Sequence, residues 1–314
     1  MGGSGGGFFV GNNSKKPRDI IEQIKREQEQ ARSRELDREF ENNVNELISD
    51  TLKSANNRDT EAVNTHLDTI IGALNKEIDG NIETVFGGSV SKHTYVDGIS
   101  DVDVLVVLND SELSDKSPSE VNSYFVERLE QRLPGTEIIQ GKLAVTVKFT
   151  DGIEIQILPS IKTDTGVKIA EEKGDNWSKI VKPRKFAEKL VNVNQACNRK
   201  VVPVIKLVKS ILSDLPEKRQ MSGYHIESMA VSIFSDYNGV KTSKSMLKHF
   251  FDKAVSGVLS PIKDKTGQTV NTDSYLGGAN SIQRKAVSDS LSGLVRKIES
   301  AERSGSLDKW KEIL

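Results

Sequence analysis

The stretch that decides the fold is residues 85–108, VFGGSVSKHTYVDGISDVDVLVVL. A short apolar segment leads into a Gly-Gly-Ser turn at Gly88 and Ser89, and a second apolar strand is predicted after a polar loop. Because glycine has no Cβ, the turn lets the backbone approach a ligand closely. Ser89 adds a hydroxyl at the predicted start of a helical turn, whose free N–H groups favour a phosphate. The turn is therefore predicted to hold phosphate.

The second predicted strand opens with two aspartates, Asp101 and Asp103, which alternate with valines. Since a strand has a period of two, both carboxylates are expected on one face of the sheet. Neighbouring carboxylates repel unless a cation lies between them, and Mg²⁺ takes oxygen ligands while it keeps waters for substrate phosphates. The pair and the turn together predict metal-assisted phosphoryl or nucleotidyl transfer. The alternative interpretation is a glycine turn beside an acidic, solvated strand edge.

The composition is typical of a soluble globular protein with one large or two modest domains. The 314 residues include 44 Lys and Arg against 45 Asp and Glu, so the overall charge attracts neither nucleic acid nor a membrane. The single cysteine, Cys197, excludes an intrachain disulfide and a cysteine-based zinc site, which suits a reducing, cytoplasmic location. No apolar run approaches ~18 residues, so no transmembrane span is predicted.

Three parts are predicted along the chain. Residues 1–33 form a flexible Gly-rich and charged tail, in which residues 15–33 are either a solvated helix or a linker. Residues 34–182 combine two supporting helices with a small mixed sheet, and residues 183–314 form a helical lobe. The fold class is therefore α+β, with helices on one side of the sheet.

Local signals support this division. Apolar residues recur at helical spacing over 36–52 and 63–74, and Ser117-Pro118-Ser119-Glu120 is typical of a capped helix start. A hairpin is expected around Asp151-Gly152, with Pro159 ending its second strand and an irregular connection over 160–182. Further helices are predicted at residues 186–193, 199–212, 224–236, 246–258 and 286–300.

The Gly88-Ser89 pair, followed after eleven residues by Asp101-Val102-Asp103-Val104, resembles the signature of the DNA polymerase β-like nucleotidyltransferase superfamily. Within it, the chain is similar to the cGAS/DncV-like (CD-NTase) and oligoadenylate-synthase-like enzymes of bacterial antiphage defence, including the Hailong-type nucleotidyltransferases. Thr94 and Leu158-Pro159-Ser160 echo those proteins. The resemblance implies a polymerase β-like palm and a C-terminal α-helical lobe that clamp a nucleoside triphosphate between them.

The resemblance also implies roles for residues of the helical lobe. Lys206 or Lys209 would hold the phosphates with Ser222 nearby, and Tyr224 would stack on the base or pack behind it. The two lysines are three residues apart, so a helix presents both on one face. The alternative is a pair of surface lysines whose stems cover apolar surface.

One position departs from the family pattern. Relatives carry a third metal-binding aspartate three residues before the proline of the Leu-Pro-Ser sequence, where this chain has Gln156. A neutral amide is a poor Mg²⁺ ligand and no general base. Glu154 is expected on the same strand face and is a candidate substitute, for metal binding as well as catalysis. If Glu154 does not take that role, either two carboxylates suffice for the site or the protein has lost catalysis.

The sequence therefore predicts a template-independent nucleotidyltransferase dependent on Mg²⁺ or Mn²⁺. It would join NTPs or dNTPs into short oligonucleotides, cyclic or linear, that signal to a downstream effector protein in antiphage defence. Modification of tRNA ends or of a protein is a weaker alternative, because no basic tract stands out. The alternative from another class is a non-catalytic module with this fold that binds a nucleotide or oligonucleotide.

Overall fold

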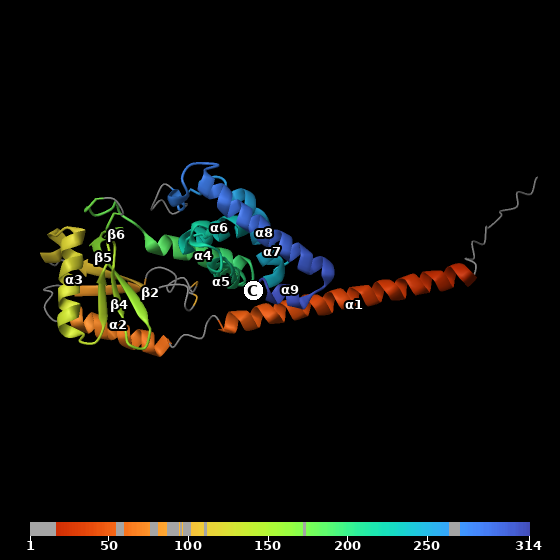
Figure 1. The fold of residues 1–314 in the computed structure, drawn as a ribbon, viewed down its shortest axis with the longest axis horizontal. Helices are drawn as coiled ribbons and strands as arrows, with labels where there is room; N and C mark the ends of the chain where they lie inside the picture. Colours follow the sequence, from red (N-terminus) through yellow and green to blue (C-terminus); the bar gives the residue numbers. More distant parts are fainter. Residues whose placement is uncertain are drawn as a thin grey trace, which may run out of the picture.

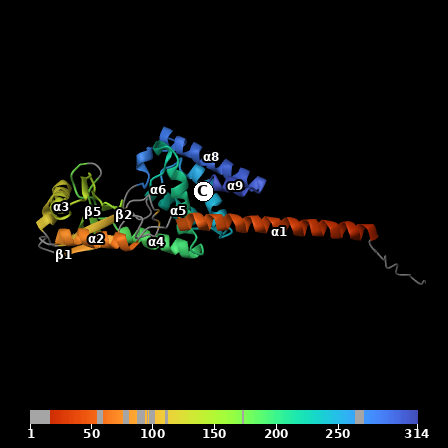
Figure 2. The same cartoon turned by 60° about the horizontal axis from the view of Figure 1, so that its bottom comes forward.

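The computed structural model describes residues 17–54, 60–75, 81–86, 94, 96, 102–109, 112–171, 174–263 and 271–314. In Figure 1 a body built on a sheet lies beside a body built of helices, and one long helix projects from the helical body. The same separation is visible after the 60° turn of Figure 2. Each of the two bodies, the palm and the helical lobe, has a hydrophobic core of its own.

In the described part of the chain, the palm is one six-stranded mixed sheet. Its main path has the order β1-β2-β5-β4-β3, and β6 pairs with the far half of β5. The pairs are antiparallel except β2 and β5, which run parallel. The strands are β1 (Asn81–Phe86), β2 (Val102–Asn109), β3 (Glu137–Gln140), β4 (Val145–Lys148), β5 (Glu154–Thr163) and β6 (Gly166–Ile169).

The prediction that Pro159 ends its strand is wrong, because β5 continues to Thr163. Proline cannot donate a ladder hydrogen bond, so it is tolerated only where no partner needs one. On one edge, β5 pairs with β4 over residues 154–157 and with β6 over residues 160–163. Pro159 falls between these two partners. The segment expected to be irregular therefore begins with strand structure that includes β6.

Two helices cover one face of the sheet, as predicted. They are α2 (Thr60–Asn75) and α3 (Pro118–Arg132), and their apolar faces meet those of β2, β4 and β5 in one core. The expected capping box at the start of α3 is present, because Ser117 and Glu120 each accept a backbone hydrogen bond from the other. The short helix η1 (Glu112–Asp115) precedes α3. The opposite face of β2 carries Leu105 and Val107, which are also buried.

The core of the helical lobe is formed by helices from the second half of the chain, together with part of α1. These helices agree with the predicted ones to within a few residues, and α9 has no counterpart among the predictions. No described helix is long and apolar enough to cross a membrane. The elements are α4 (Pro183–Ala196), α5 (Val201–Ser213), η2 (Glu217–Arg219), α6 (Gly223–Phe234), α7 (Ser243–Gly257), η3 (Ser274–Leu276), α8 (Ile282–Ser304) and α9 (Leu307–Lys311).

The long helix α1 (Pro17–Ser54) does not support the palm sheet, contrary to the prediction. Val44 and Ile48 belong to the core of the helical lobe, and Glu41 forms an ion pair with Lys244 of α7. The described side chains before Phe40 are exposed, and this part of α1 projects from the body in Figure 1. The charged segment expected to be a solvated helix or linker is thus the first half of a helix.

Candidate active site

The predicted catalytic stretch meets β5 at the start of β2. Val102 pairs with Ile155, and position 103 pairs with Gln156 in the parallel ladder. Gly88, Ser89 and Asp101 lie outside the described residues, as does the side chain of Asp103. In the register of this ladder, Gln156 occupies the place on the neighbouring strand next to position 103. A third carboxylate would have to come from elsewhere.

Glu154, the candidate for that third carboxylate, carries an ion pair of its own. Its Oε1 lies 2.9 Å from Nζ of Lys148, which is its register partner on β4. Both side chains are more than a third exposed, and such pairs contribute about 0–1 kcal/mol. A cost of that size would not prevent Glu154 from turning toward a metal ion. Its predicted role stays a prediction.

The two lysines of α5 have different environments. Lys209 is buried, and its ammonium donates hydrogen bonds to Oε1 of Glu227 at 2.9 Å and to the carbonyl oxygen of Thr94 at 3.0 Å. Lys206 is half-buried, and its pKa is lowered by burial first and by the charge of Lys209 second. Lys209 is buried in this contact, whereas Lys206 is only half-buried, so Lys206 is the stronger candidate for binding phosphate.

Thr94 extends this contact into a three-residue network, which we call the Thr94 clasp (Thr94, Lys209 and Glu227). The Thr94 hydroxyl donates to Oε1 of Glu227 at 2.5 Å, and all three residues are buried. In sequence, Thr94 lies between the Gly-Gly-Ser turn and Asp101. The clasp therefore fixes this point of the catalytic stretch to α5 and α6 of the lobe. The sequence points to Thr94 and Lys209 separately but gives no sign that they meet.

Ser222 and Tyr224, both predicted to lie near the nucleotide, are at the start of α6. Ser222 is the N-cap, its hydroxyl accepts from the backbone N–H of His225, and its own N–H donates to the Tyr275 hydroxyl. Tyr224 is half-buried, with its ring 5.1 Å from that of Phe186. Gly223, between them, lies against the Lys209 side chain. A Cβ added at Gly223 would be 3.4 Å from Cε and Nζ of Lys209. This turn therefore borders the Thr94 clasp.

A buried polar cluster beneath the same turn is absent from the predictions. Arg284 of α8 donates to Asp273 at 2.7 Å, and Nδ1 of His225 is 3.0 Å from the Tyr275 hydroxyl. His225 is fully buried, which lowers its pKa to about 4 despite the nearby charge of Asp273. The cluster ties residues 273–275 to α6 and α8. Nothing in the sequence identifies Arg284 as the partner of Asp273.

The metal site expected from the sequence involves groups that the structure leaves undescribed. Among the described residues, no three His, Cys, Asp or Glu side chains are grouped to hold a metal ion. That set excludes Asp101 and the Asp103 carboxylate. Carboxylates are the hard oxygen ligands that Mg²⁺ and Mn²⁺ prefer, so the types of residue at the start of β2 fit such an ion.

A mixed sheet of this order, with an Asp-x-Asp strand beside β5 and a helical lobe clasped to its loop, is the architecture of a polymerase β-like nucleotidyltransferase. Residues 37–194, half of the chain, match the model of the Second Messenger Oligonucleotide or Dinucleotide Synthetase (SMODS) domain. The chain therefore belongs to this family of cGAS/DncV-like nucleotidyltransferases. No curated protein sequence matches it.

Solved structures of this family share the fold at low sequence identity. The Vibrio cholerae DncV cyclic AMP-GMP synthase in complex with nonhydrolyzable GTP has a TM-score of 0.61 at 12% identity, over 92% of this chain and 90% of that one. E. coli MS115-1 CdnC with ATP has a TM-score of 0.59 at 15% identity, over 81% and 89%. Rhodothermus marinus CdnE c-UMP-AMP synthase has a TM-score of 0.56 at 20% identity, over 76% and 91%.

Proposed function

We propose that this nucleotidyltransferase joins NTPs or dNTPs into short oligonucleotides without a template, releasing pyrophosphate at each step. The observation that carries the proposal is the parallel β2–β5 ladder within the SMODS match, since it brings the Asp-x-Asp strand beside position 156. The oligonucleotide, cyclic or linear, would act in the cytoplasm as an antiphage signal read by a downstream effector protein.

In this proposal Asp101 and Asp103 hold the divalent metal ion, with Glu154 as a further ligand. The ion, Mg²⁺ or Mn²⁺, would supply charge neutralisation for the triphosphate and the leaving pyrophosphate. Glu154 would orient or deprotonate the attacking hydroxyl, which the amide of Gln156 cannot do.

The turn and the lobe would position the nucleotide. Backbone N–H groups at Gly88 and Ser89 suit a phosphate oxygen, and Lys206 would hold the triphosphate with its positive charge. Ser222 would lie near the phosphates, and Tyr224 would stack on the base or pack behind it. These residues would bind and orient the nucleotide. They would lower the barrier because the nucleotide gives up its translational and rotational freedom on binding, before the bond forms.

The experiment that tests the proposal is incubation with each radiolabelled NTP and dNTP and Mg²⁺, followed by separation of the products. The control is the variant Asp101→Asn/Asp103→Asn, which keeps the size of both side chains. Loss of the charges that stabilise the transition state costs roughly 3–4 kcal/mol or more, so the rate should fall beyond ~10²-fold. Equal product yields from both proteins would refute a metal site at these aspartates.

A second candidate function is binding of a nucleotide or oligonucleotide without catalysis. Gln156 beside position 103 favours it, because a neutral amide replaces the expected acid. One comparison distinguishes the two functions: a sensor binds a labelled nucleotide but forms no phosphodiester bond, whichever NTP, dNTP or metal ion is supplied.

The E. coli CdnC that shares the fold has been solved in a complex with a HORMA protein. By analogy, we propose to test activity with and without partner proteins before catalysis is judged absent.

A further inference from the structure

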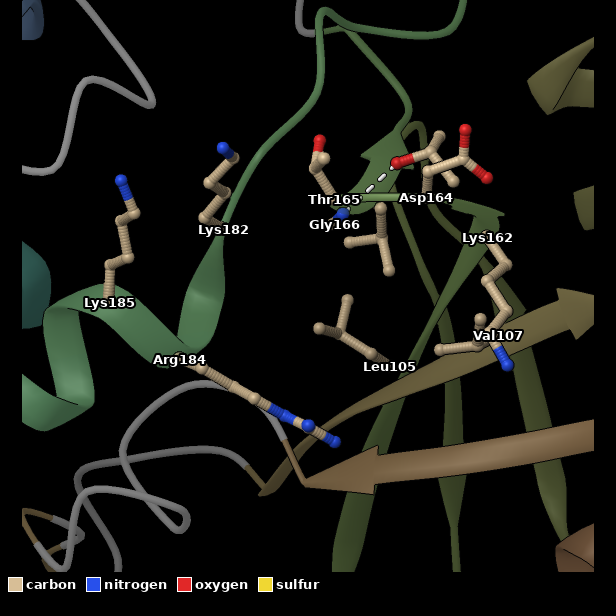
Figure 3. A pocket seen from close by; sticks show the side chains of 11 residues that line it. Leu105, Val107, Lys162, Asp164, Thr165, Gly166, Lys182, Arg184 and Lys185 are labelled. Carbon is tan, nitrogen blue, oxygen red and sulfur yellow. Dashed lines mark hydrogen bonds between the residues drawn. The ribbon is translucent and has the colours of Figure 1, made fainter.

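A cavity of about 500 Å³ lies on the palm, between β2, the β5–β6 hairpin and the first turn of α4 (Figure 3). Its volume is in the range of small-molecule sites. Leu105 and Val107 of β2 form an apolar floor. Of the residues assigned above to metal or nucleotide binding, none that the structure describes lines this cavity.

The charged side chains around the cavity are mainly cationic. Among the described residues that line it, four are basic and one, Asp164, is a carboxylate. The basic residues are Lys162, Lys182, Arg184 and Lys185. In Figure 3 Lys182 and Lys185 stand on the α4 side, and Arg184 reaches from α4 toward the strands. Within the described part of the chain, no ion pair to Lys182, Arg184 or Lys185 is present, so their charges add to a positive potential at the cavity.

The start of α4 adds to this potential. The N-cap residue Lys182 makes no side-chain capping hydrogen bond, and Pro183 follows as the first helical residue. The positive end of the helix dipole is thus not offset by a capping oxygen. A ligand that satisfies both parts of the cavity needs an anionic group for the α4 side and an apolar face for Leu105 and Val107. Inorganic phosphate offers only the first, and a nucleotide offers both.

The cavity continues from the predicted catalytic position along the same strand. Leu105 and Val107 follow position 103 at intervals of two, and the span from 103 to 107 is about 13 Å at ~3.3 Å per residue. A ligand in the cavity therefore lies beyond the reacting centre, at a distance suited to the part of a growing chain that precedes its attacking 3′ end.

We propose that this cavity binds the upstream nucleotides of a linear oligonucleotide product, with their phosphates on Lys182, Arg184 and Lys185. This binding role rests on the proposed nucleotidyl transfer and implies that the product is extended beyond two nucleotides. Retention of the upstream segment favours addition of a third and later nucleotide over release after the first bond.

The test compares Arg184→Glu/Lys185→Glu with Arg296→Glu/Lys297→Glu, an exposed Arg-Lys pair on α8 that is remote from the cavity. Both variants change the net charge by the same amount. Fluorescence anisotropy measures binding of dye-labelled single-stranded tetranucleotides, one ribo and one deoxyribo. Gel separation measures the ratio of longer products to dinucleotide.

We expect the cavity variant to lose at least tenfold in affinity for a tetranucleotide and to show a smaller salt dependence of binding, while the control matches wild type. The ratio of longer products to dinucleotide should fall in the cavity variant only. Equal affinities in the two variants, or wild-type product that stops at two nucleotides, would overturn the inference and leave the proposed function in place. Absence of any bond formation by wild type would overturn the proposed function instead, and the anisotropy data would still report on the cavity.

Discussion

The ammonium of Lys209 lies 2.9 Å from the carboxylate of Glu227, and the two side chains are 4% and 1% exposed. Two charges removed from water this completely are stable only together, because each compensates the desolvation of the other. Thr94 of the catalytic stretch also bonds to this pair. Its hydroxyl donates to Glu227, and its carbonyl oxygen accepts from Lys209. The contact between palm loop and lobe is thus electrostatic as well as steric.

Removal of one partner of this pair should destabilise the protein strongly. We expect Glu227→Ala to lower the free energy of unfolding by about 3–5 kcal/mol, because it leaves a buried ammonium without its counter-charge. Urea unfolding measures the change. The exposed pair Lys311–Asp308 provides the control, and Lys311→Ala should have no measurable effect. A double variant, Lys209→Met/Glu227→Met, should recover part of the loss. A Glu227→Ala protein as stable as wild type would contradict the compensation argument.

Lys206 should bind the triphosphate in its charged form. Lys206→Ala is expected to weaken the affinity for a non-hydrolysable NTP by roughly 1.5–3 kcal/mol, the range for hydrogen bonds to charged groups. Because burial lowers the pKa of Lys206, the ammonium loses its proton at a lower pH than an ordinary lysine, and affinity should fall as the pH rises through that value. Lys206→Arg keeps its charge and should flatten this dependence.

Calorimetric titration between pH 7 and pH 10 measures both effects on Lys206. Unchanged affinity in Lys206→Ala at neutral pH would exclude the residue from the phosphate site. The same alkaline loss in wild type and Lys206→Arg would assign the pH dependence to another group.

Glu154 and its partner Lys148 give a matched pair of variants. Glu154→Gln removes the carboxylate and the ion pair, whereas Lys148→Met removes the ion pair and keeps the carboxylate. If Glu154 replaces the missing acid, Glu154→Gln should lose most of the activity, and both Lys148→Met and Gln156→Ala should lose much less. Initial rates of phosphodiester formation measure this. Full activity in Glu154→Gln would indicate a site with two carboxylates.

His225 should make stability depend on mildly acidic pH. Its pKa is about 4 in the folded protein, mainly because burial disfavours the imidazolium, against 6.5 for the ordinary group. The unfolded chain therefore binds the proton more readily, and stability falls as the pH drops from about 6.5 toward 4. Asp273, Arg284 and Tyr275 surround the ring.

Urea unfolding at pH 7 and pH 5 tests the role of His225 with His225→Asn as the comparison, since asparagine does not titrate. The variant should lose less stability between the two pH values than wild type. Equal losses would show that other groups cause the acid sensitivity.

Local patterns are sufficient to predict much of the fold. The strand that begins at Val102, the capping box at Ser117 and the helical periodicity of the lobe are each decided within a few residues, and the structure confirms them. Pro159 shows where local rules fail. Its tolerance depends on a gap between β4 and β6, two strands that only the folded sheet places on one edge of β5.

In the candidate site, too, some features follow from a local pattern and others only from the folded structure. The spacing of Gly88, Ser89, Asp101 and Asp103 is a local signature, so the sequence alone leads to the family. The different burial of Lys206 and Lys209 is not local, because it depends on Glu227 and on Thr94, which is 115 residues away in the chain. Helical spacing puts both lysines on one face, and only packing shows that the Lys209 ammonium bonds to Glu227 and Thr94.

The strand β5 pairs with three others, and its parallel partner β2 is separated from it by η1, α3, β3 and β4. The hairpins that β5 forms with β4 and β6 close over short stretches of chain, whereas the β2–β5 ladder closes a loop of about fifty residues. Closure of that loop raises the contact order of the palm, and pairings of this kind form slowly. The register that aligns position 103 with Gln156 is therefore expected to form last, after hairpins and helices. Substitutions within the β2–β5 seam should then speed unfolding of the palm more than they slow its folding.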